Sequence, residues 1–485
     1  MSKVLRDILK NIDYRLYGEL PNEINAISNN SKKTTAGDLF FAIRGTQTDG
    51  HQYISQAIQN GAIAIVTEEY QENINIPPQI VVSNGRTALS TAAANYYDNP
   101  SNKLTVIGVT GTNGKTTTVY LLNIILQTAG IACGSIGTLG FSIHDKFFPI
   151  NLTTPDSLQL QQILAKMVDE KIDVVVMEVS SHALSLNRVD DIQFTGGVFT
   201  NISQDHLDFY LTIDNYVNAK VELFRKIIKT GFRLSNIDDS YSDKFNATGD
   251  AQLFTYSVDS QADFTWKSDI KYKTGIEGTI TSRNISIPIK SSMSGYYNLS
   301  NILAASASAI QLGIQPSIIS QAIASVDYIP GRLQEVQMEG FPRVFIDYAH
   351  TPDAIVNVLR ALKDIVPSDG KLVTVFGCGG NRDKTKRPKM AEAAASLSDS
   401  VIITTDNPRF EDPEAIIEDA VKGFDKNENY IKITDRKAAI QFAIENSSTK
   451  DIVAILGKGH ENYQEINGVR HPFSDVKIVE ELFGK

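Results

Sequence analysis

A lysine and a run of threonines follow three glycines between residues 108 and 118, where the sequence reads GVTGTNGKTTT. Glycines allow backbone N–H groups to close on phosphate oxygens, and a helix N-terminus adds positive potential. Lys115 can then reach the β- and γ-phosphates of a nucleotide, and the Thr116 hydroxyl can hold Mg²⁺. The spacing is a variant of G-x-x-x-x-G-K-[ST], because Val109 stands at its first position. An ordinary strand-to-helix turn would leave Lys115 and Thr116 unexplained, so this segment predicts a nucleotide-phosphate site.

Two further side chains could bind the metal that accompanies a nucleotide. Glu178 ends the apolar run DVVVME, and a carboxylate is a hard oxygen ligand of the kind that Mg²⁺ prefers. The alternative for Glu178 is the capping of a following helix. His206 lies in ISQDHLDFY. Because imidazole is an unusual ligand for Mg²⁺, His206 either binds the metal or is oriented by Asp205 without touching it.

Basic side chains elsewhere could recognise anions. Lys220 lies among apolar residues in NYVNAKVELF, a pattern that by itself favours a surface lysine whose stem covers apolar atoms. A second basic group, RDKTKR at 382–387, follows a Gly-Cys-Gly-Gly turn, which favours anion recognition over a solvated surface. Arg409 offers a planar fork for a carboxylate, and Glu461 offers an anion for an ammonium group. Together these two residues could hold an amino acid.

Short apolar strands that alternate with helices must position these groups. The strand predicted at 104–109 leads into the glycine loop, and 119–126 continues as a helix. Further buried strands are predicted at 173–178 and 197–201, and 298–311 is predicted to be a small-residue helix that packs closely on the sheet. This alternation predicts a mostly parallel α/β sheet, whose ligands gather at the carboxyl ends of the strands.

The length of 485 residues is too great for one ordinary core, so several domains are expected. We predict α/β domains at 1–99, 100–331 and 332–485, with Asn99-Pro100 marking the first border. The first domain is expected to begin with an amphipathic helix over 1–16. The third is expected to contain four strands, each followed by a loop dense in polar groups: 343–348, 371–376, 401–404 and 452–456.

Composition and charge narrow the class of protein. The formal net charge of −10 argues against a nucleic-acid partner, whose phosphates call for a basic face. No apolar run approaches the roughly 20 residues that span a bilayer, so no membrane insertion is expected. The N-terminus lacks the apolar core of a signal peptide, and the chain has only two cysteines, Cys133 and Cys378. These features predict a cytoplasmic protein without a disulfide scaffold or a four-cysteine zinc site.

Seven motifs lie between residues 111 and 353, in the second and third predicted domains: GTNGKTT, TTPDS, EVSSHAL, NISQDHLD, YNLSNILAA, GRLQ and DYAHTPD. With these motifs the chain resembles the Mur ligases, ATP-dependent amide-bond synthetases of peptidoglycan assembly. Three more segments resemble the members that add the third residue of the stem peptide: GCGGNRDKTKRPKM at 377–390, DNPRFEDP at 406–413 and GKGHE at 457–461.

The resemblance implies a fold and a reaction. The fold would be an N-terminal UDP-binding domain, a central ATP-binding domain with a mostly parallel P-loop-type sheet, and a C-terminal Rossmann-like α/β domain that binds the amino acid. ATP would phosphorylate the γ-carboxylate of UDP-N-acetylmuramoyl-L-alanyl-D-glutamate, and the amine of meso-2,6-diaminopimelate would attack the acyl phosphate. Such transfer depends mainly on positioning and charge neutralisation. A cytoplasmic monomer that uses Mg²⁺, ATP and these small-molecule substrates is expected.

The resemblance also implies which residues form the site. The catalytic residues would be Lys115, Glu178, His206 and Lys220. Mg²⁺ would be held by Thr116, Glu178, His206 and Lys220, the last as a carbamate (N6-carboxylysine), which replaces the surface interpretation of this lysine. ATP would bind to Gly111, Thr112, Asn113, Gly114, Lys115, Thr116, Thr117, Asn301, Arg332, Asp347 and His350. The sugar-nucleotide dipeptide would bind to Ser31, Asn151, Thr153, Thr154, Ser180 and Arg188.

The identity of the added amino acid rests on the DNPR motif, which resembles that of the diaminopimelate-adding members. Lysine-adding relatives lack this arginine. Diaminopimelate differs from lysine by a second carboxylate, which Arg409 could hold through two parallel hydrogen bonds. An arginine left unpaired in a buried site would cost several kcal/mol, enough to reject lysine. By resemblance the pocket consists of Arg382, Asp406, Asn407, Pro408, Arg409, Gly457 and Glu461.

The chain departs from the family pattern at two places. Asn30-Ser31-Lys32 replaces the usual Asp-Ser-Arg of the uridine-binding segment, and Leu186 stands where many relatives have glutamine. Three alternatives to a diaminopimelate-adding ligase are the same reaction with L-lysine, a folylpolyglutamate-type amide ligase, and a non-catalytic nucleotide-binding protein. The N-terminal domain and DNPR argue against the second. The combination of Lys115, Glu178, Lys220 and His206 argues against the third.

Overall fold

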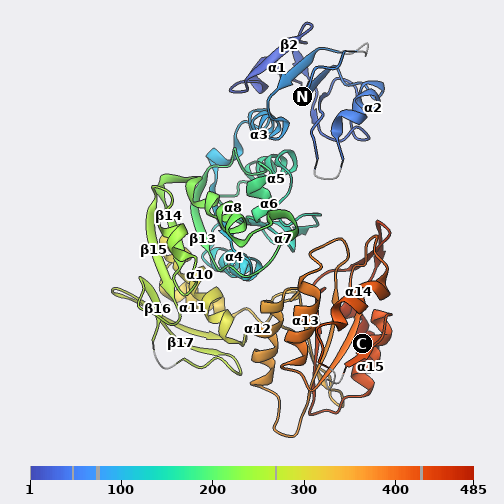
Figure 1. Ribbon diagram of the computed structural model, residues 1–485. Coiled ribbons are helices and arrows are strands. Elements are labelled where there is room, and N and C mark those ends of the chain that lie inside the picture. Colours follow the sequence, from blue (N-terminus) through green and yellow to red (C-terminus); the bar gives the residue numbers. More distant parts are fainter. Residues whose placement is uncertain (1, 46–47, 73–76, 268–269, 426–429, 485) are drawn as a thin grey trace.

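The computed structural model describes residues 2–45, 48–72, 77–267, 270–425 and 430–484 (Figure 1). Its strands form three main sheets in chain order: five strands between residues 14 and 82, eleven between 105 and 291, and six between 334 and 456. Each sheet lies within one of the predicted domains, and we keep 1–99, 100–331 and 332–485 as the proposed division into three units. In the part of the chain that is described, no helix has the length and apolar character that crossing a membrane requires.

The first unit is a five-stranded sheet with short helices, drawn in blue in Figure 1. The strand order is β2-β7-β6-β5-β4, in which β4 to β7 run parallel and β2 pairs antiparallel at one edge. The strands are β1 Lys3–Val4, β2 Tyr14–Tyr17, β3 Glu23–Ile24, β4 Ile27–Ser28, β5 Leu39–Phe41, β6 Ala64–Thr67 and β7 Gln79–Val82. The helices are α1 Leu5–Ile8, the 3₁₀ helix η1 Gly50–Tyr53, α2 Ile54–Gln59 and α3 Gly85–Tyr96.

The predicted helix over the first 16 residues is wrong. Only α1 is helical there, because β1 pairs with β3 before it and the chain turns into β2 after it. The turn passes through Asn11, whose φ of 65° ends the helical path. Leu5, Ile8 and Leu9 are buried, so the apolar residues that suggested a long helix lie in the single turn of α1 and at the residue that follows it.

The central unit is built on the eleven-stranded sheet, in the order β11-β10-β9-β12-β8-β13-β14-β15-β16-β17-β18. Its strands are β8 Thr105–Thr110, β9 Cys133–Gly137, β10 Gly140–Ile143, β11 Lys146–Phe148, β12 Val174–Glu178, β13 Phe194–Phe199, β14 Ile227–Asn236, β15 Gln252–Ser257, β16 Phe264–Trp266, β17 Ile276–Ser282 and β18 Ile285–Ser291. Its helices are η2 Pro100–Lys103, α4 Lys115–Thr128, α5 Ser157–Asp169, α6 Ser181–Ser185, α7 Leu207–Tyr210, α8 Ile213–Arg225, α9 Ser242–Asn246, α10 Tyr296–Gln311 and α11 Pro316–Ala324.

The central sheet is parallel from β9 through β16 and antiparallel only at its two edges, as predicted. One apolar core joins it to α4, α10 and α11, and a second core joins its other face to α5 and α8. The predicted small-residue helix is α10, whose alanines pack against α4, the helix that follows the glycine loop. Since β8, β12 and β13 are parallel neighbours, the loops after Thr110, Glu178 and Phe199 meet at one edge.

The third unit is a six-stranded sheet in the order β19-β20-β24-β21-β22-β23, parallel except for β19. Its strands are β19 Gln334–Val336, β20 Arg343–Asp347, β21 Leu372–Cys378, β22 Ser400–Thr405, β23 Tyr430–Lys432 and β24 Ile452–Leu456, and a separate hairpin is formed by β25 Tyr463–Ile466 and β26 Val469–Pro472. Its helices are α12 Pro352–Lys363, α13 Lys386–Ala395, α14 Pro413–Val421, α15 Arg436–Glu445 and α16 Asp475–Leu482.

The four strands predicted for the third unit are confirmed as β20, β21, β22 and β24, with bounds shifted by at most two residues. The edge strands β19 and β23 and the hairpin β25–β26 were not predicted. They are three or four residues long and partly or wholly exposed, so their sequences contain too few apolar positions to show a period.

A buried ion pair ties the loops of the third unit to its helices. Arg436 at the start of α15 and Asp475 at the start of α16 are bonded through two nitrogens, at 2.9 and 2.8 Å, and both side chains have 0% exposure. Arg436 also donates to the carbonyl oxygens of Thr405 and Leu456, the last residues of β22 and β24. The pair therefore fixes two strand ends that carry proposed site loops.

Replacing Asp475 by asparagine should destabilise the third unit by about 3–5 kcal/mol, because it leaves a buried guanidinium without a counter-charge. The matched control is Lys437→Ala, which breaks the exposed Lys437–Glu481 pair between the same two helices. Exposed pairs contribute only about 0–1 kcal/mol. Hydrogen exchange of β22 and β24 amides in increasing urea measures both effects. Equal stabilities of the two variants would contradict this assignment.

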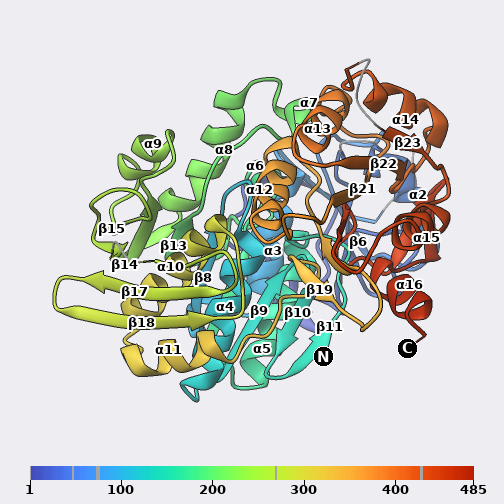
Figure 2. The same ribbon diagram turned by 90° about the horizontal axis from the view of Figure 1, so that it is seen from below.

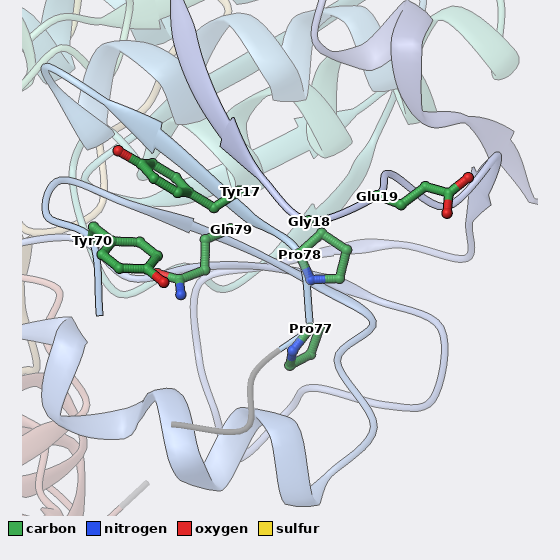
Figure 3. A pocket seen from close by; sticks show the side chains of 7 residues that line it. All are labelled: Tyr17, Gly18, Glu19, Tyr70, Pro77, Pro78 and Gln79. Atoms are coloured by element: carbon green, nitrogen blue, oxygen red, sulfur yellow. The ribbon is translucent and has the colours of Figure 1, made fainter. Parts of the chain in front are cut away.

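A cavity of about 340 Å³ opens on the first unit, beside β2 and β7 (Figure 3). It is lined by Tyr17, Gly18, Glu19, Tyr70, Pro77, Pro78 and Gln79. The rings of Tyr17 and Tyr70 stack at 4.3 Å between centroids. No predicted site residue lines this cavity. Most of the predicted residues lie instead in the central and third units, at strand ends or on helices that pack beside them.

Candidate active site

The glycine loop lies between β8 and α4 at the carboxyl edge of the central sheet. Gly114 has φ of 85° and directly precedes α4, so the helix N-terminus points into the loop. A Cβ at this position would lie 2.3 Å from Oδ1 of Asn301 on α10, which explains the need for glycine and places Asn301 beside the loop. Thr200 Oγ1 donates to the Asn113 carbonyl at 2.7 Å, so the loop after β13 supports the glycine loop.

Two lysines converge on one carbonyl oxygen of this loop. Lys115 Nζ donates to Gly111 O at 2.9 Å and Lys220 Nζ, on α8, donates to the same oxygen at 2.7 Å. Lys220 is only 1% exposed, so the interpretation as a surface lysine is wrong. Burial, reinforced by the nearby Lys115, lowers the pKa of Lys220 well below its usual value. Burial also lowers the pKa of Lys115.

Glu178, the last residue of β12, lies next to the first turn of α4. Its Oε1 accepts hydrogen bonds from Thr116 Oγ1 at 2.9 Å and from the Thr138 N–H at 2.8 Å. Its Oε2 accepts one from Thr138 Oγ1 at 3.1 Å. Helix capping does not explain Glu178, because Ser180 caps α6. Glu178 is 1% exposed and lies beside Thr116, the threonine that the sequence predicts as a Mg²⁺ ligand.

His206 precedes α7 and is paired with Asp205. Its Nε2 lies 3.3 Å from Asp205 Oδ2, and its ring lies 4.6 Å from that of His182. Burial lowers the pKa of His206 to about 3, outweighing the opposite effect of Asp205, so the ring is neutral at pH 7. Although burial opposes its ionisation, His206 and Lys386 hold the pKa of Asp205 below its usual value. Orientation by Asp205, one of the two predicted alternatives, is therefore present in the structure.

Residues from the start of the third unit reach the glycine loop. Arg332 donates from Nη2 to Thr116 Oγ1 at 2.9 Å and lies 4.7 Å from the Tyr348 ring. Asp347 ends β20 and accepts the N–H groups of Leu333 and Ala349, which fixes the segment that carries Arg332. Burial raises the pKa of Asp347 and lowers that of His350 to about 4. Arg332 is thus brought beside Lys115, Thr116 and Glu178, whereas Thr117 faces the core from α4.

Besides the Arg332–Thr116 bond, the Lys273–Asp364 pair and the contacts of the connecting segment 329–334, five hydrogen bonds or ion pairs join described residues of the central and third units, which Figure 2 draws in cyan to yellow and in orange to red. They are Asn113 Nδ2 to Asp353 Oδ2 at 3.1 Å, Lys389 Nζ to Gln204 Oε1 at 2.8 Å, Lys386 Nζ to Asp205 Oδ1 at 3.5 Å, His460 Nε2 to Thr138 O at 3.1 Å, and Arg470 Nη1 to Asn151 Oδ1 at 2.8 Å. The two units are therefore closed on each other around the glycine loop and Glu178.

Four of the residues predicted for the sugar-nucleotide dipeptide gather near Glu178. Thr154 Oγ1 donates to the Glu178 carbonyl at 2.8 Å and accepts from the Ser180 N–H at 3.1 Å. Arg188 Nη1 donates to the Thr154 carbonyl at 2.9 Å, and Thr153 lies 3.2 Å from the Thr138 hydroxyl. Asn151 is bonded to Arg470 of the third unit. Ser31 belongs to the first unit, where its hydroxyl donates to Gln56 Oε1 at 2.7 Å.

The residues predicted for the amino acid lie together at strand ends of the third unit. Asn407 Nδ2 donates to Glu461 Oε2 at 2.9 Å, which links the loops after β22 and β24. Arg409 donates to the Gly380 carbonyl at 2.7 Å, and its Nε lies 3.7 Å from Glu465. Burial and the neighbouring Arg409 lower the pKa of Arg382. Asp406 faces Gly457, where a Cβ would lie 2.7 Å from Asp406 Oδ2, and Pro408 adjoins Gly380.

Sequence reasoning missed the residue that holds this pocket together. Lys458 is 0% exposed and donates to Asn407 Oδ1 at 3.1 Å and to Glu461 Oε2 at 2.9 Å. Its position inside the GKGHE motif was the available signal. Glu465, which faces Arg409, was also missed, because it belongs to the unpredicted hairpin β25–β26.

The predicted anion-binding role of the basic group at 382–387 needs correction. Arg387 is 1% exposed and pairs with Glu411 at 2.9 Å and Asp419 at 3.0 Å, so its charge is used to join α13 to α14 and the loop before it. Lys384 also pairs with Glu411, and Lys386 pairs with Asp205. Within this group, Arg382 lies close to Arg409 and Glu465 and so belongs with the proposed amino-acid pocket.

Basic side chains gather at this junction although the whole chain carries a net charge of −10. Lys115, Lys220 and Arg332 surround the glycine loop, while Arg382 and Arg409 lie in the third unit. A few basic side chains grouped in an acidic protein can bind small anions but do not offer the broad basic face that nucleic acid requires. The arrangement fits phosphate and carboxylate groups brought together between two units.

Comparisons with known proteins decide the family. Three family models match successive parts of the chain: Mur ligase family, catalytic domain, at 23–100; Mur ligase middle domain at 109–309; and Mur ligase, glutamate ligase domain, at 331–459. A Clostridium tetani protein named UDP-N-acetylmuramoyl-L-alanyl-D-glutamate--2,6-diaminopimelate ligase is 40% identical over 485 residues, covering 99% of each chain. The chain belongs to the Mur ligase family.

Solved structures of Mur ligases share the fold. One, described as UDP-N-acetylmuramoyl-L-alanyl-D-glutamate--2,6-diaminopimelate ligase, aligns over 100% of this chain and 99% of its own with a TM-score of 0.68 and 32% identity. The MurF ligase of Thermotoga maritima in complex with ADP aligns over 95% of this chain and 97% of its own, with a TM-score of 0.65 and 20% identity. The predicted family and its α/β Mur ligase fold are therefore confirmed.

The two departures from the Mur ligase pattern have local explanations. Asn30 Oδ1 accepts the Lys32 N–H at 3.0 Å, so asparagine closes the turn around Ser31 as an aspartate would. Leu186 follows α6 and donates its N–H to His182 O. Its side chain, unlike that of glutamine, can make no hydrogen bond at this position.

Proposed function

We propose that this Mur ligase adds meso-2,6-diaminopimelate to the γ-carboxylate of UDP-N-acetylmuramoyl-L-alanyl-D-glutamate, with conversion of ATP to ADP and phosphate, in peptidoglycan synthesis. The observation that carries the proposal is the closed junction in which Lys115, Glu178 and Arg332 of the nucleotide region meet the loops that hold Arg409 and Glu461. The family and the named relatives point to the same reaction. We further propose that the protein acts in the cytoplasm, where ATP and UDP-sugar substrates are available, and that it is a monomer.

The reaction needs two transfers at one place. An oxygen of the γ-carboxylate attacks the γ-phosphorus of ATP and ADP leaves. The amine nitrogen of diaminopimelate then attacks the acyl carbon, the C–O bond to the phosphate breaks, inorganic phosphate leaves, and the nitrogen loses a proton. In the proposed roles, the N–H groups of 111–114 and Lys115 hold the phosphates. Arg332 adds a second cation beside Thr116. Such charge neutralisation at fixed positions is the main contribution of proteins to phosphoryl transfer.

The residues present fit a magnesium ion. Protein sites for Mg²⁺ with nucleotides use one or two carboxylates together with substrate phosphates. Thr116 Oγ1 and Glu178 Oε1 are 2.9 Å apart and offer such a pair. Within the described residues, no three His, Cys, Asp or Glu side chains form a metal-binding group, so other ligands, substrate oxygens among them, would complete the coordination. Mg²⁺ bound there would neutralise charge on phosphate oxygens.

Lys220 could supply a second carboxylate after reacting with CO₂. The neutral amine nitrogen forms a bond to the carbon of CO₂ and loses a proton, which leaves a carbamate. The lowered pKa of Lys220 favours the neutral amine that this addition requires. The shared carbonyl of Gly111 keeps this amine beside Lys115, whose charge would stabilise the anionic product. We therefore propose Lys220 as the carbamylated residue and, with His206, Thr116 and Glu178, as a metal ligand.

Replacing Arg409 by alanine should raise the KM for diaminopimelate by about 100-fold, because hydrogen bonds to charged groups contribute about 1.5–3 kcal/mol. The KM for ATP should change less than about twofold, since the contact concerns one substrate. Steady-state kinetics with each substrate varied in turn measure both values. Lys432→Ala, in the exposed Lys432–Glu418 pair of the same unit, is the control expected to change neither. Equal increases in the two KM values would contradict the pocket.

Phosphate release tests the proposed function against its alternatives. The purified chain is mixed with ATP, Mg²⁺, UDP-N-acetylmuramoyl-L-alanyl-D-glutamate and one amino acid at a time. Release that depends on diaminopimelate is expected. Release with L-lysine instead would indicate the lysine-adding reaction, and release with a folate and glutamate would indicate a folylpolyglutamate-type ligase. Release with none of these would favour a non-catalytic nucleotide-binding protein.

A further inference from the structure

The turn between β9 and β10 joins three parts of the proposed site through one residue, Thr138. Its N–H and its hydroxyl bind both oxygens of Glu178, at 2.8 and 3.1 Å. The same hydroxyl lies 3.2 Å from that of Thr153, on the side of the proposed sugar-nucleotide dipeptide. Its carbonyl oxygen lies 3.1 Å from Nε2 of His460, which belongs to the third unit.

His460 is held beside the hinge between the two units. Gly331, the last residue of the central unit, has φ of +64°, and a Cβ there would lie 2.2 Å from the backbone nitrogen of His460. Any side chain at 331 would push the hinge and the GKGHE loop apart, so glycine permits their contact. The ring of His460 also lies 5.4 Å from that of Tyr348, which follows β20. The ring is therefore also in contact with a side chain of the third unit.

The protonation of His460 defines the direction of its hydrogen bond. Burial lowers the pKa of His460 to about 4, so the ring is neutral at pH 7 and carries one N–H. A carbonyl oxygen only accepts, which assigns that N–H to Nε2. Nδ1 is then buried and, within the described part of the chain, has no hydrogen-bond partner. Among the described residues, the bond to Thr138 is therefore the one hydrogen bond of this ring.

These contacts close a circuit around the proposed metal carboxylate. It runs from Thr116 to Glu178, to Thr138, to His460, to Gly331 and Arg332, and back to Thr116. Two of its hydrogen bonds cross between the central and third units: Thr138 to His460, and Arg332 to Thr116. The circuit is complete only when the two units are closed on each other.

We propose that His460 is a positioning residue that fixes the orientation of Glu178 when the third unit closes on the central unit. This role rests on the proposed function and concerns a side chain outside the groups proposed to touch substrates. His460 donates a hydrogen bond to the Thr138 carbonyl and so holds the turn between β9 and β10 in place. The N–H and the hydroxyl of Thr138 can then both donate to Glu178. Since His460 adjoins Glu461 of the amino-acid pocket, closure over the amino acid and completion of the carboxylate site occur together.

Three substitutions of His460 in the full chain separate hydrogen bonding from packing. Glutamine places an N–H the same number of bonds from Cα as Nε2 of histidine, whereas asparagine falls one bond short and leucine has no donor. One hydrogen bond corresponds to about a three- to tenfold effect. His460→Leu and His460→Asn should lower kcat by this factor and raise the Mg²⁺ concentration for half-maximal rate. His460→Gln should recover most of both, and the KM for diaminopimelate should stay within about twofold.

A binding measurement without turnover tests the same claim independently of the reaction. Mn²⁺ binding to the chain with AMPPNP, followed by electron paramagnetic resonance, should be about three- to tenfold weaker in His460→Leu than in the unmodified chain. His460→Gln should bind Mn²⁺ like the unmodified chain. If the leucine and glutamine variants bind Mn²⁺ equally well, His460 does not position Glu178 and the proposal is wrong. If the unmodified chain binds Mn²⁺·AMPPNP but ligates no amino acid, the proposed function fails while this test still applies.

A second variant guards against a general loss of structure. Thr138→Val removes the hydroxyl bond to Glu178 but keeps the carbonyl that His460 binds. Residues that act in one chain of hydrogen bonds show coupled effects. The double variant with His460→Leu should therefore weaken Mn²⁺ binding by less than the product of the two single effects. Fully independent effects would overturn the proposal, even if the leucine variant were less stable.

Discussion

Replacement of Lys115 by alanine is expected to lower kcat by at least about 10³-fold, the upper range for loss of one charge-stabilising donor. In this structure Lys115 donates to the carbonyl oxygens of Gly111 and Thr112, both at 2.9 Å, so its ammonium lies within the loop that would receive the phosphates. ADP formation in the presence of all three substrates measures the effect.

The loss should come without loss of stability. Burial lowers the pKa of Lys115, so its charged form is disfavoured by folding and does not stabilise the native state at pH 7. The melting temperature of Lys115→Ala should therefore equal or exceed that of the unmodified chain. Lys103→Ala, an exposed lysine just before β8, is the control that should retain full activity. Retention of more than about a tenth of the rate in Lys115→Ala would remove this lysine from the chemistry.

Replacement of Lys220 by alanine is expected to lower kcat by roughly 10²–10³-fold, because it removes the proposed carbamate and its negative charge. Formate or acetate should restore part of the activity by placing a small carboxylate in the space that the side chain leaves. Lys229→Ala, an exposed lysine on β14, should need no rescue.

The unmodified chain offers a second test of the carbamate through its pH dependence. CO₂ adds only to the neutral amine, and burial together with Lys115 lowers the pKa of Lys220, so the reactive form is present at lower pH than for an exposed lysine. Activity should fall after removal of dissolved CO₂ and return when bicarbonate is added, with faster return at higher pH. Insensitivity to CO₂, together with failure of carboxylates to restore the alanine variant, would argue against the carbamate.

The sequence predicted the parts of the fold and site that depend on neighbouring residues. A β-branched strand, a glycine loop and Lys115-Thr116 specify a local structure, and β8, the loop and α4 follow that pattern. The buried strands of the third unit were predicted for the same reason. The N-terminal helix failed because a short apolar pattern cannot reveal that its neighbours pair as strands with distant residues.

Other features depend on contacts between residues far apart in the chain, and local pattern does not report them. Lys220 has the sequence context of a surface lysine, yet its amine is buried against Gly111, and only the family resemblance gave it a role. Arg387 has the context of an anion-binding residue, yet Glu411 and Asp419 neutralise it. The bond between Thr138 and His460 joins residues from two units and has no sequence signature.

The most direct test of the account is the mass of the nucleotide product formed from ATP, UDP-N-acetylmuramoyl-L-alanyl-D-glutamate and an equimolar mixture of meso-diaminopimelate and L-lysine. The account predicts one product, the UDP-linked tripeptide that contains diaminopimelate, formed together with one ADP for each amide bond. A product that contains lysine, or hydrolysis of ATP without any amide product, would contradict it.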